Sequence, residues 1–66
     1  MDLRQLSNFV RIVDAGSLTR AASQIGVAQP ALTYQIANLE EELGTSLLIR
    51  SASGVRPTEA GLVLYR

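Results

Sequence analysis

The chain has 66 residues, with six arginines, no lysine, six acidic residues and a formal net charge of zero. It contains no cysteine and no histidine, which excludes disulfides, thiol chemistry and zinc sites built on those ligands. This length allows one small domain that buries only about 60% of its unfolded surface, and the longest uninterrupted apolar run, residues 62–65, is far too short to span a membrane.

Catalytic side chains are scarce. Histidine, cysteine and lysine are absent, and the three adjacent acids Glu40, Glu41 and Glu42 fan around a predicted helix instead of converging on one point. The five glycines are scattered, and no phosphate-cradling loop follows a strand. We therefore expect no enzymatic activity, no metal site and no cofactor.

Residues 1–15 are predicted to form the first helix. Apolar side chains recur at three- and four-residue spacing at Leu3, Leu6, Phe9, Val10 and Val13, with Ile12 beside them. Asp2 is a candidate N-cap, Gly16 ends the helix, and Phe9 is expected in the core. Arg4 and Arg11 lie off the apolar stripe, where they are either solvated or face phosphate.

Residues 17–44 are predicted to form two helices joined by a tight turn. Ser17 is a good N-cap, and Gly26 can end the first helix with a positive φ. Pro30 suits the first position of the second helix. That helix carries one apolar stripe, made by Leu32, Ile36, Leu39 and Leu43. A short glycine-containing turn between two helices is typical of the helix-turn-helix motif, although any helical hairpin of a small bundle has similar caps.

The opposite face of the second helix is small and polar. Pro30, Tyr34 and Ala37 point away from the stripe, with Thr33 and Asn38 on its flanks. Such a face suits base edges better than a generic solvated face, which would carry more charge. The acids at 40–42 lie at the far end, so the N-terminal turns are the candidate reading surface.

Residues 47–56 are predicted to form a β-hairpin. A short apolar run is followed by a turn at residues 51–54, and Pro57 disfavours helix at Arg56. A hairpin after a helix-turn-helix gives a winged arrangement, which favours nucleic-acid binding by Arg50 and Arg56. The alternative for both arginines is an ion pair with Glu40–Glu42.

A last helix is predicted to begin at Thr58, an N-cap candidate, with Glu59 in its first turn. Leu62, Leu64 and Tyr65 give it an apolar surface without a core of its own, so we expect dimerisation through this helix. The sequence stops in mid-helix at Arg66, and we expect the 66 residues to be a fragment of a longer protein.

Several spaced motifs in one register resemble the N-terminal domain of LysR-type transcriptional regulators, which are bacterial winged helix-turn-helix proteins. The motifs are GSLTRAA at 16–22, AQPALT at 28–33, LEEELG at 39–44 and GVRPTEAG at 54–61. The segments PAL, LLIR and GVRPT are also similar to the branch that contains nitrogen-assimilation regulators.

The resemblance implies a mainly α fold of three helices, a short β-hairpin wing and the start of a linker helix. Residues 1–57 would form the DNA-binding domain and residues 58–66 the beginning of the dimerisation helix, whereas the effector-binding domain lies outside the 66 residues. It further implies a cytoplasmic homodimer or tetramer that binds double-stranded DNA of the form T-N11-A, regulates transcription and responds to a small-molecule inducer.

The resemblance also assigns roles to residues. Base reading in the major groove would fall to Gln29, Pro30, Thr33 and Tyr34. Contacts to DNA backbone, or support for them, would come from Ser17, Leu18, Thr19, Arg50 and Thr58, with Arg56 added from its place in the wing. Ser53, beside Gly54 in the wing, stands where many members of the family carry arginine. The alternative function is a winged-helix protein–protein interaction module that uses the same face.

Overall fold

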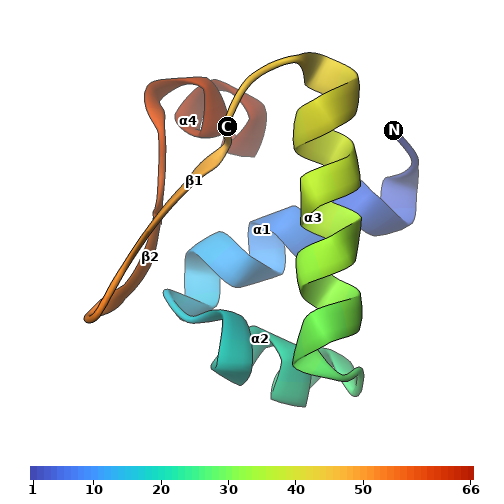
Figure 1. Cartoon of the computed structure of the whole chain (residues 1–66), viewed down its shortest axis with the longest axis vertical. Coiled ribbons are helices and arrows are strands. Elements are labelled where there is room, and N and C mark those ends of the chain that lie inside the picture. The colour runs from blue at the N-terminus through green and yellow to red at the C-terminus, as the bar shows by residue number, and fades with distance from the viewer.

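The computed structural model describes residues 1–66 and confirms the predicted order of elements. Three helices come first, α1 (Leu3–Ala15), α2 (Leu18–Ile25) and α3 (Gln29–Leu43). The antiparallel strands β1 (Leu48–Ser51) and β2 (Gly54–Pro57) and the helix α4 (Glu59–Tyr65) follow. In Figure 1, α3 crosses in front of α1, α2 lies beside the N-terminal end of α3, and the hairpin projects to one side. This is a mainly α winged helix-turn-helix.

Side chains cap three of the four helices at the predicted residues. The Asp2 carboxylate accepts a hydrogen bond from the Gln5 N–H at 2.8 Å, and the Gln5 side chain accepts one from the Asp2 N–H. Ser17 Oγ accepts from the Arg20 N–H at 3.1 Å. Helix α3 differs, because Ala28 is its N-cap and no side chain caps it. Pro30 is therefore its second residue, not its first.

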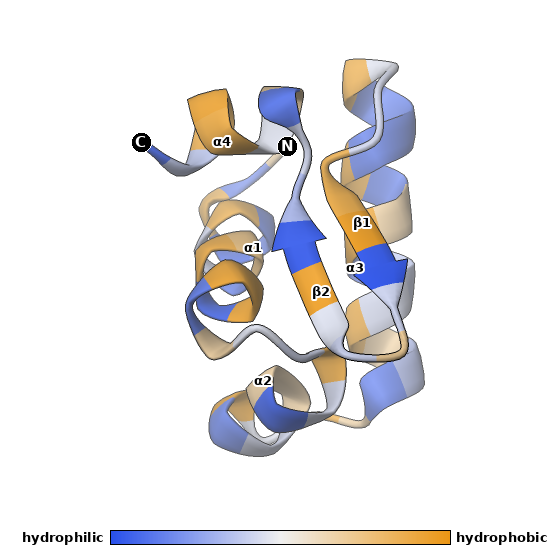
Figure 2. Ribbon diagram, turned by 90° about the vertical axis from the view of Figure 1, so that its left-hand side faces the viewer, coloured by the Kyte–Doolittle hydropathy of each residue, from blue (hydrophilic) through white to orange (hydrophobic).

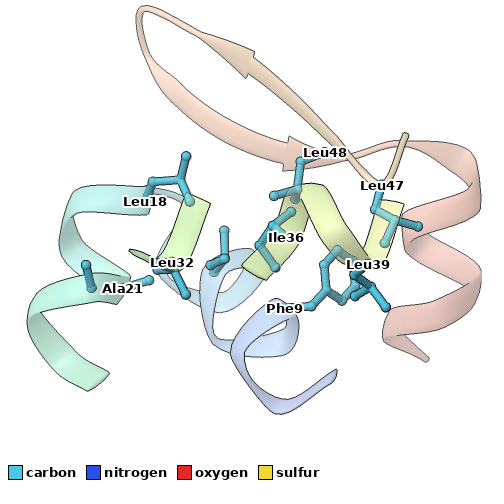
Figure 3. Packing of buried hydrophobic residues seen from close by; sticks show 10 residues of the cluster. Phe9, Leu18, Ala21, Leu32, Ile36, Leu39, Leu47 and Leu48 are labelled. Atoms are coloured by element: carbon cyan, nitrogen blue, oxygen red, sulfur yellow. The ribbon is translucent and has the colours of Figure 1, made fainter. Parts of the chain in front are cut away.

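The core is one cluster of ten apolar side chains, of which Figure 3 labels eight. Leu32, Ile36 and Leu39 of the α3 stripe are fully buried, as predicted. The two ends of the predicted stripes are not: Leu3 is 84% exposed and Leu43 is 40% exposed. Both lie in terminal turns, beyond the reach of the neighbouring helices. Ile12, expected only at the flank of its stripe, is fully buried.

Two partly buried polar contacts hold α3 to its neighbours. The Asn8 side chain, buried on α1, donates from Nδ2 to Gln35 Oε1 at 2.6 Å. At the other end of α3, Glu40 Oε2 accepts hydrogen bonds from the backbone N–H groups of Leu47 at 2.7 Å and Leu48 at 3.3 Å. The Glu40 carboxylate thus fixes the point at which the hairpin leaves α3.

The hairpin is attached to the helices at its middle as well as at its base. The Val55 N–H donates to the Gly16 carbonyl at 3.1 Å, and the Thr58 N–H donates to the Leu47 carbonyl at 3.0 Å. Figure 2 shows β2 lying on the side of α1 and β1 on the side of α3. Gly54 has a φ of +131°, and a Cβ at this residue would overlap the Gly16 carbonyl oxygen. Only glycine allows this close approach.

Helix α4 is joined to the body of the domain by its first two turns. Gly61 is buried, and a Cβ there would overlap the Leu47 carbonyl oxygen. Leu64, expected on a dimer surface, is half-buried and packs against the core cluster. Val63, which was not singled out, is 62% exposed instead. None of the four helices combines the length and apolar character that crossing a membrane requires.

The close contact at Gly61 gives a prediction with a defined sign. Helix propensity alone would make Gly61→Ala stabilising by about 1 kcal/mol. Because the new methyl group meets backbone, we expect it to lower the free energy of unfolding by about 1–3 kcal/mol. Urea unfolding followed by circular dichroism measures this. The control is Val63→Ala on the exposed face of α4, which should change stability by less than about 0.5 kcal/mol. A stabilised Gly61→Ala would contradict the contact.

A second prediction concerns the hydrogen bond that the Tyr65 hydroxyl donates to Asp14 Oδ1. This bond, and secondly the negative charge of the carboxylate, raise the pKa of Tyr65 above its ordinary value of 10.0. The folded state therefore favours the neutral phenol, and its stabilisation is present below pH 10 and lost as the pH rises through the raised pKa. The unfolding free energy of the wild type should exceed that of Tyr65→Phe below pH 10, and the difference should shrink above it.

The matched control is Tyr34→Phe, because the Tyr34 hydroxyl has no hydrogen-bond partner in the chain. This variant should keep the alkaline fall in stability of the wild type. Identical pH courses for Tyr65→Phe and the wild type would show that the hydrogen bond from Tyr65 to Asp14 contributes nothing to folding.

Candidate nucleic-acid interface

The outward face of α3 gathers the four residues predicted to read bases. Gln29, Pro30, Thr33 and Tyr34 line one shallow hollow with Ala37. Thr33 is half-buried, the other four are exposed, and Tyr34 has 68% of its surface open to solvent. The stripe of Leu32, Ile36 and Leu39 turns the opposite side of the helix into the core. The burial of one face thus determines which side chains the other face presents.

Negative charge is confined to the far end of this helix. Glu41 lies about 16 Å along the axis from Pro30, at 1.5 Å per residue. Of its neighbours, Glu40 is bound to the backbone of the hairpin and Glu42 forms an ion pair with the N-terminal amino group of Met1. The N-terminal turns of α3 therefore present hydrogen-bonding groups and the positive end of the helix dipole without an acidic side chain.

The N-terminus of α2 offers a second set of donors. Ser17 Oγ accepts from the Arg20 N–H, but the proton of the Ser17 hydroxyl has no acceptor within the chain. Leu18, expected to contact DNA backbone or support that contact, is only 7% exposed, and its side chain packs in the core. The backbone N–H of Leu18 is left without a partner in the chain, as is usual in the first turn of a helix.

Thr19 connects α2 to the outward face of α3. Its hydroxyl donates a hydrogen bond to Gln29 Oε1 at 2.9 Å. Both side chains are exposed. The contact joins the second residue of α2 to the first residue of α3, across the turn of the helix-turn-helix.

The two arginines of the hairpin point to opposite sides of it. In the antiparallel register, Arg50 lies opposite Val55 and Arg56 lies opposite Ile49. Val55 packs against the core and Ile49 is 41% exposed, so Arg50 is on the face turned towards the helices and Arg56 is on the outer face. Neither forms the ion pair with Glu40–Glu42 considered as an alternative.

The hydroxyl groups of Thr58 and Ser53 both have contacts within the chain. The Thr58 hydroxyl donates to the Ser46 carbonyl at 2.7 Å and accepts from the Gly61 N–H at 3.0 Å. Its single proton is therefore in use. Ser53 is exposed at the tip of the hairpin, 3.0 Å from Ser51 Oγ, next to Gly54.

No cluster of three or more metal-ligating side chains is found. Comparison with known proteins then decides the family. The family described as bacterial regulatory helix-turn-helix proteins of the lysR family matches residues 3–62. The chain belongs to the LysR family. Two LysR-family relatives are the nitrogen assimilation regulatory proteins of Klebsiella aerogenes, 58% identical, and Escherichia coli K12, 57% identical, each over 98% of this chain and 21% of the relative. The chain thus spans about a fifth of the length of these curated relatives.

Solved LysR-family structures superpose closely on this fold. The DNA-binding domain of CbnR in a complex with DNA has a TM-score of 0.94 and 40% identity, over 98% of this chain and 75% of that one. The corresponding domain of BenM with benA site 1 DNA has a TM-score of 0.93 and 48% identity, over 98% and 76%. BenM is a transcriptional regulator of Acinetobacter baylyi.

Proposed function

We propose that this LysR-family domain binds double-stranded DNA sequence-specifically and regulates transcription, with the N-terminal half of α3 in the major groove. The observation that carries the proposal is the acid-free outward face formed by Gln29, Pro30, Thr33 and Tyr34. The exposed face of an α-helix fits the major groove, which admits a helix. Complexes of the similar CbnR and BenM domains with DNA support it.

Each side chain of the face has a chemical role. The Gln29 amide pairs bidentately with the N6 and N7 atoms of adenine, and the carbons of Pro30 and Thr33 pack against thymine methyl groups. The ring of Tyr34 joins this apolar contact. Its hydroxyl, which has no partner in the chain, forms a hydrogen bond with a base or a phosphate. The face thus reads A·T pairs, in keeping with the T-N11-A sites that we expect for the family.

Phosphate contacts flank the reading face. We assign the Ser17 hydroxyl, the Leu18 backbone N–H and the wing arginines Arg50 and Arg56 to the DNA backbone, because each has a donor free of partners within the chain. Thr58 supports this approach by holding the base of the wing. Thr19 lies beside these donors, in the first turn of α2.

The exposed surface of α4 is the proposed site of dimerisation. Leu62, Val63 and Tyr65 remain exposed on it, and a longer helix would pair two chains about a two-fold axis. In such a dimer, or a tetramer built from it, the recognition helices lie one DNA turn, about 34–36 Å, or a multiple of it apart. A regulator of this kind acts in the bacterial cytoplasm without catalysis, and a sensor domain beyond this chain would bind its small-molecule inducer.

The reading face gives the main test of the function. We expect Gln29→Ala to weaken binding to a specific dyad site by about 1–3 kcal/mol and to relax the preference at one base pair per half-site. Binding to random DNA should hardly change, because no charge is lost. The measurement is affinity across a library of single-base variants of the site, on the chain extended through the dimerisation helix.

The control for this experiment is Asn38→Ala, which removes a similar exposed amide further along α3. It should leave the base preferences unchanged. A uniform loss for Gln29→Ala across the library would contradict base reading by Gln29 and move that role to Thr33 and Tyr34.

The wing gives a test that also separates DNA from a protein partner. Arg50→Ala should weaken binding to all DNA sequences about equally and reduce the slope of log K against log salt by about one unit. Arg4→Ala is the matched control, because it removes the same charge near the acidic end of α3. Arg56→Ala, on the outer face of the wing, reports whether that face also meets phosphate. Binding that hardly depends on salt would favour the protein–protein module instead.

A further inference from the structure

The hydroxyl of Thr19 is already in use in the DNA-free chain. It donates to Gln29 Oε1 at 2.9 Å. A threonine hydroxyl carries one proton, and a phosphate oxygen can only accept hydrogen bonds. A Thr19 hydroxyl bound to Gln29 therefore cannot also donate to a DNA phosphate. The two roles exclude each other, and in the DNA-free chain the hydroxyl is bound to Gln29.

Gln29 is a side chain that needs such a partner. It is exposed, it is the first residue of α3, and no side chain caps this end of the helix. A free glutamine samples many rotamers and loses that freedom when it pairs with a base. A partner that holds its amide beforehand reduces this loss, which is the general benefit of preorganisation.

The contact also leaves Gln29 one acceptor lone pair and its amide protons. Gln29 Oε1 has a second lone pair, and the Nε2 protons have no acceptor in the chain. The remaining donor and acceptor match the adenine edge, where N7 accepts and the N6 amino group donates. The hydrogen bond from Thr19 therefore restricts the amide while leaving the second lone pair of Oε1 and the Nε2 protons for the adenine edge.

We propose that Thr19 is a positioning residue for sequence readout: it holds the Gln29 amide in the orientation that pairs with adenine, and does not bind phosphate itself. The inference rests on the proposed function, because it assumes that Gln29 reads a base. It adds that the specificity of α3 depends on a residue of α2 that touches no base.

The experiment compares Thr19→Val, which keeps the branched shape and loses the hydroxyl, with Thr19→Ser, which keeps the hydroxyl. On the specific dyad site, Thr19→Val should weaken binding about 3- to 10-fold, the fold-change of one ordinary hydrogen bond. The loss should be concentrated at the base pair that Gln29→Ala also relaxes, with random DNA bound as before. Thr19→Ser should restore both the affinity and the preference.

The double variant separates positioning from phosphate contact. In the Gln29→Ala background, Thr19→Val should cause no further loss, because nothing remains to be positioned. An equal loss in both backgrounds, across all sequences and with a smaller affinity for random DNA, would overturn the proposal and assign Thr19 to the backbone. In DNA-free protein, the Gln29 side-chain amide should also become more mobile in Thr19→Val, as measured by ¹⁵N relaxation of Nε2.

The outcomes distinguish the inference from the function beneath it. If Gln29→Ala changes a base preference and Thr19→Val does not, only the positioning role fails. If Gln29→Ala changes no base preference, the reading role of Gln29 fails and the positioning role fails with it. Both variants alter exposed residues, and an unchanged thermal unfolding midpoint confirms that each protein tested is folded.

Discussion

The burial of one face of α3 is the contact on which the rest of the domain depends. Leu32, Ile36 and Leu39 are fully buried against α1 and α2, and each contributes about 1.5–3 kcal/mol by leaving water. In a domain of this size that is a large share of the total stability. The same burial fixes the rotation of α3 about its axis, so folding and the presentation of the outward face are one event. Small residues assist it, because Ala21 and Ala22 let α2 approach closely.

Hydrogen bonds within the chain divide its polar groups into those that hold the fold together and those that remain free to bind a partner. Glu40 and Thr58 resemble surface residues in the sequence, yet both hold the base of the hairpin through backbone groups. Ser17 caps α2 and keeps a free proton. Of the three adjacent acids, Glu42 pairs with the amino group of Met1, and Glu40 is held by backbone N–H groups of the hairpin. This division explains how a chain with no net charge can present a surface that suits a polyanion.

Local signals made most of the fold predictable from sequence. Caps, glycine helix ends and apolar periodicity depend on residues within a few positions, and they placed all four helices and the hairpin correctly. Errors arose where tertiary packing decides. The core reaches Leu64 but not Leu3 or Leu43, because the neighbouring elements, and not the apolar spacing, decide which side chains of a stripe are covered. Gly61 reads as a weak helix residue, whereas in the fold it allows backbone contact with Leu47. The link from Thr19 to Gln29 joins two helices at no characteristic spacing, so no sequence pattern indicates it.

The attachment of the hairpin has a consequence for how such domains can vary. Its base is tied to Leu47 and its second strand to the Gly16 carbonyl, so neither end can lengthen without displacing α4 or the start of α2. Ala52 and Ser53 at the tip make none of these backbone hydrogen bonds. Insertions at this point would lengthen the wing and leave α3 undisturbed. The tip is therefore the natural place to graft additional contacts onto the domain.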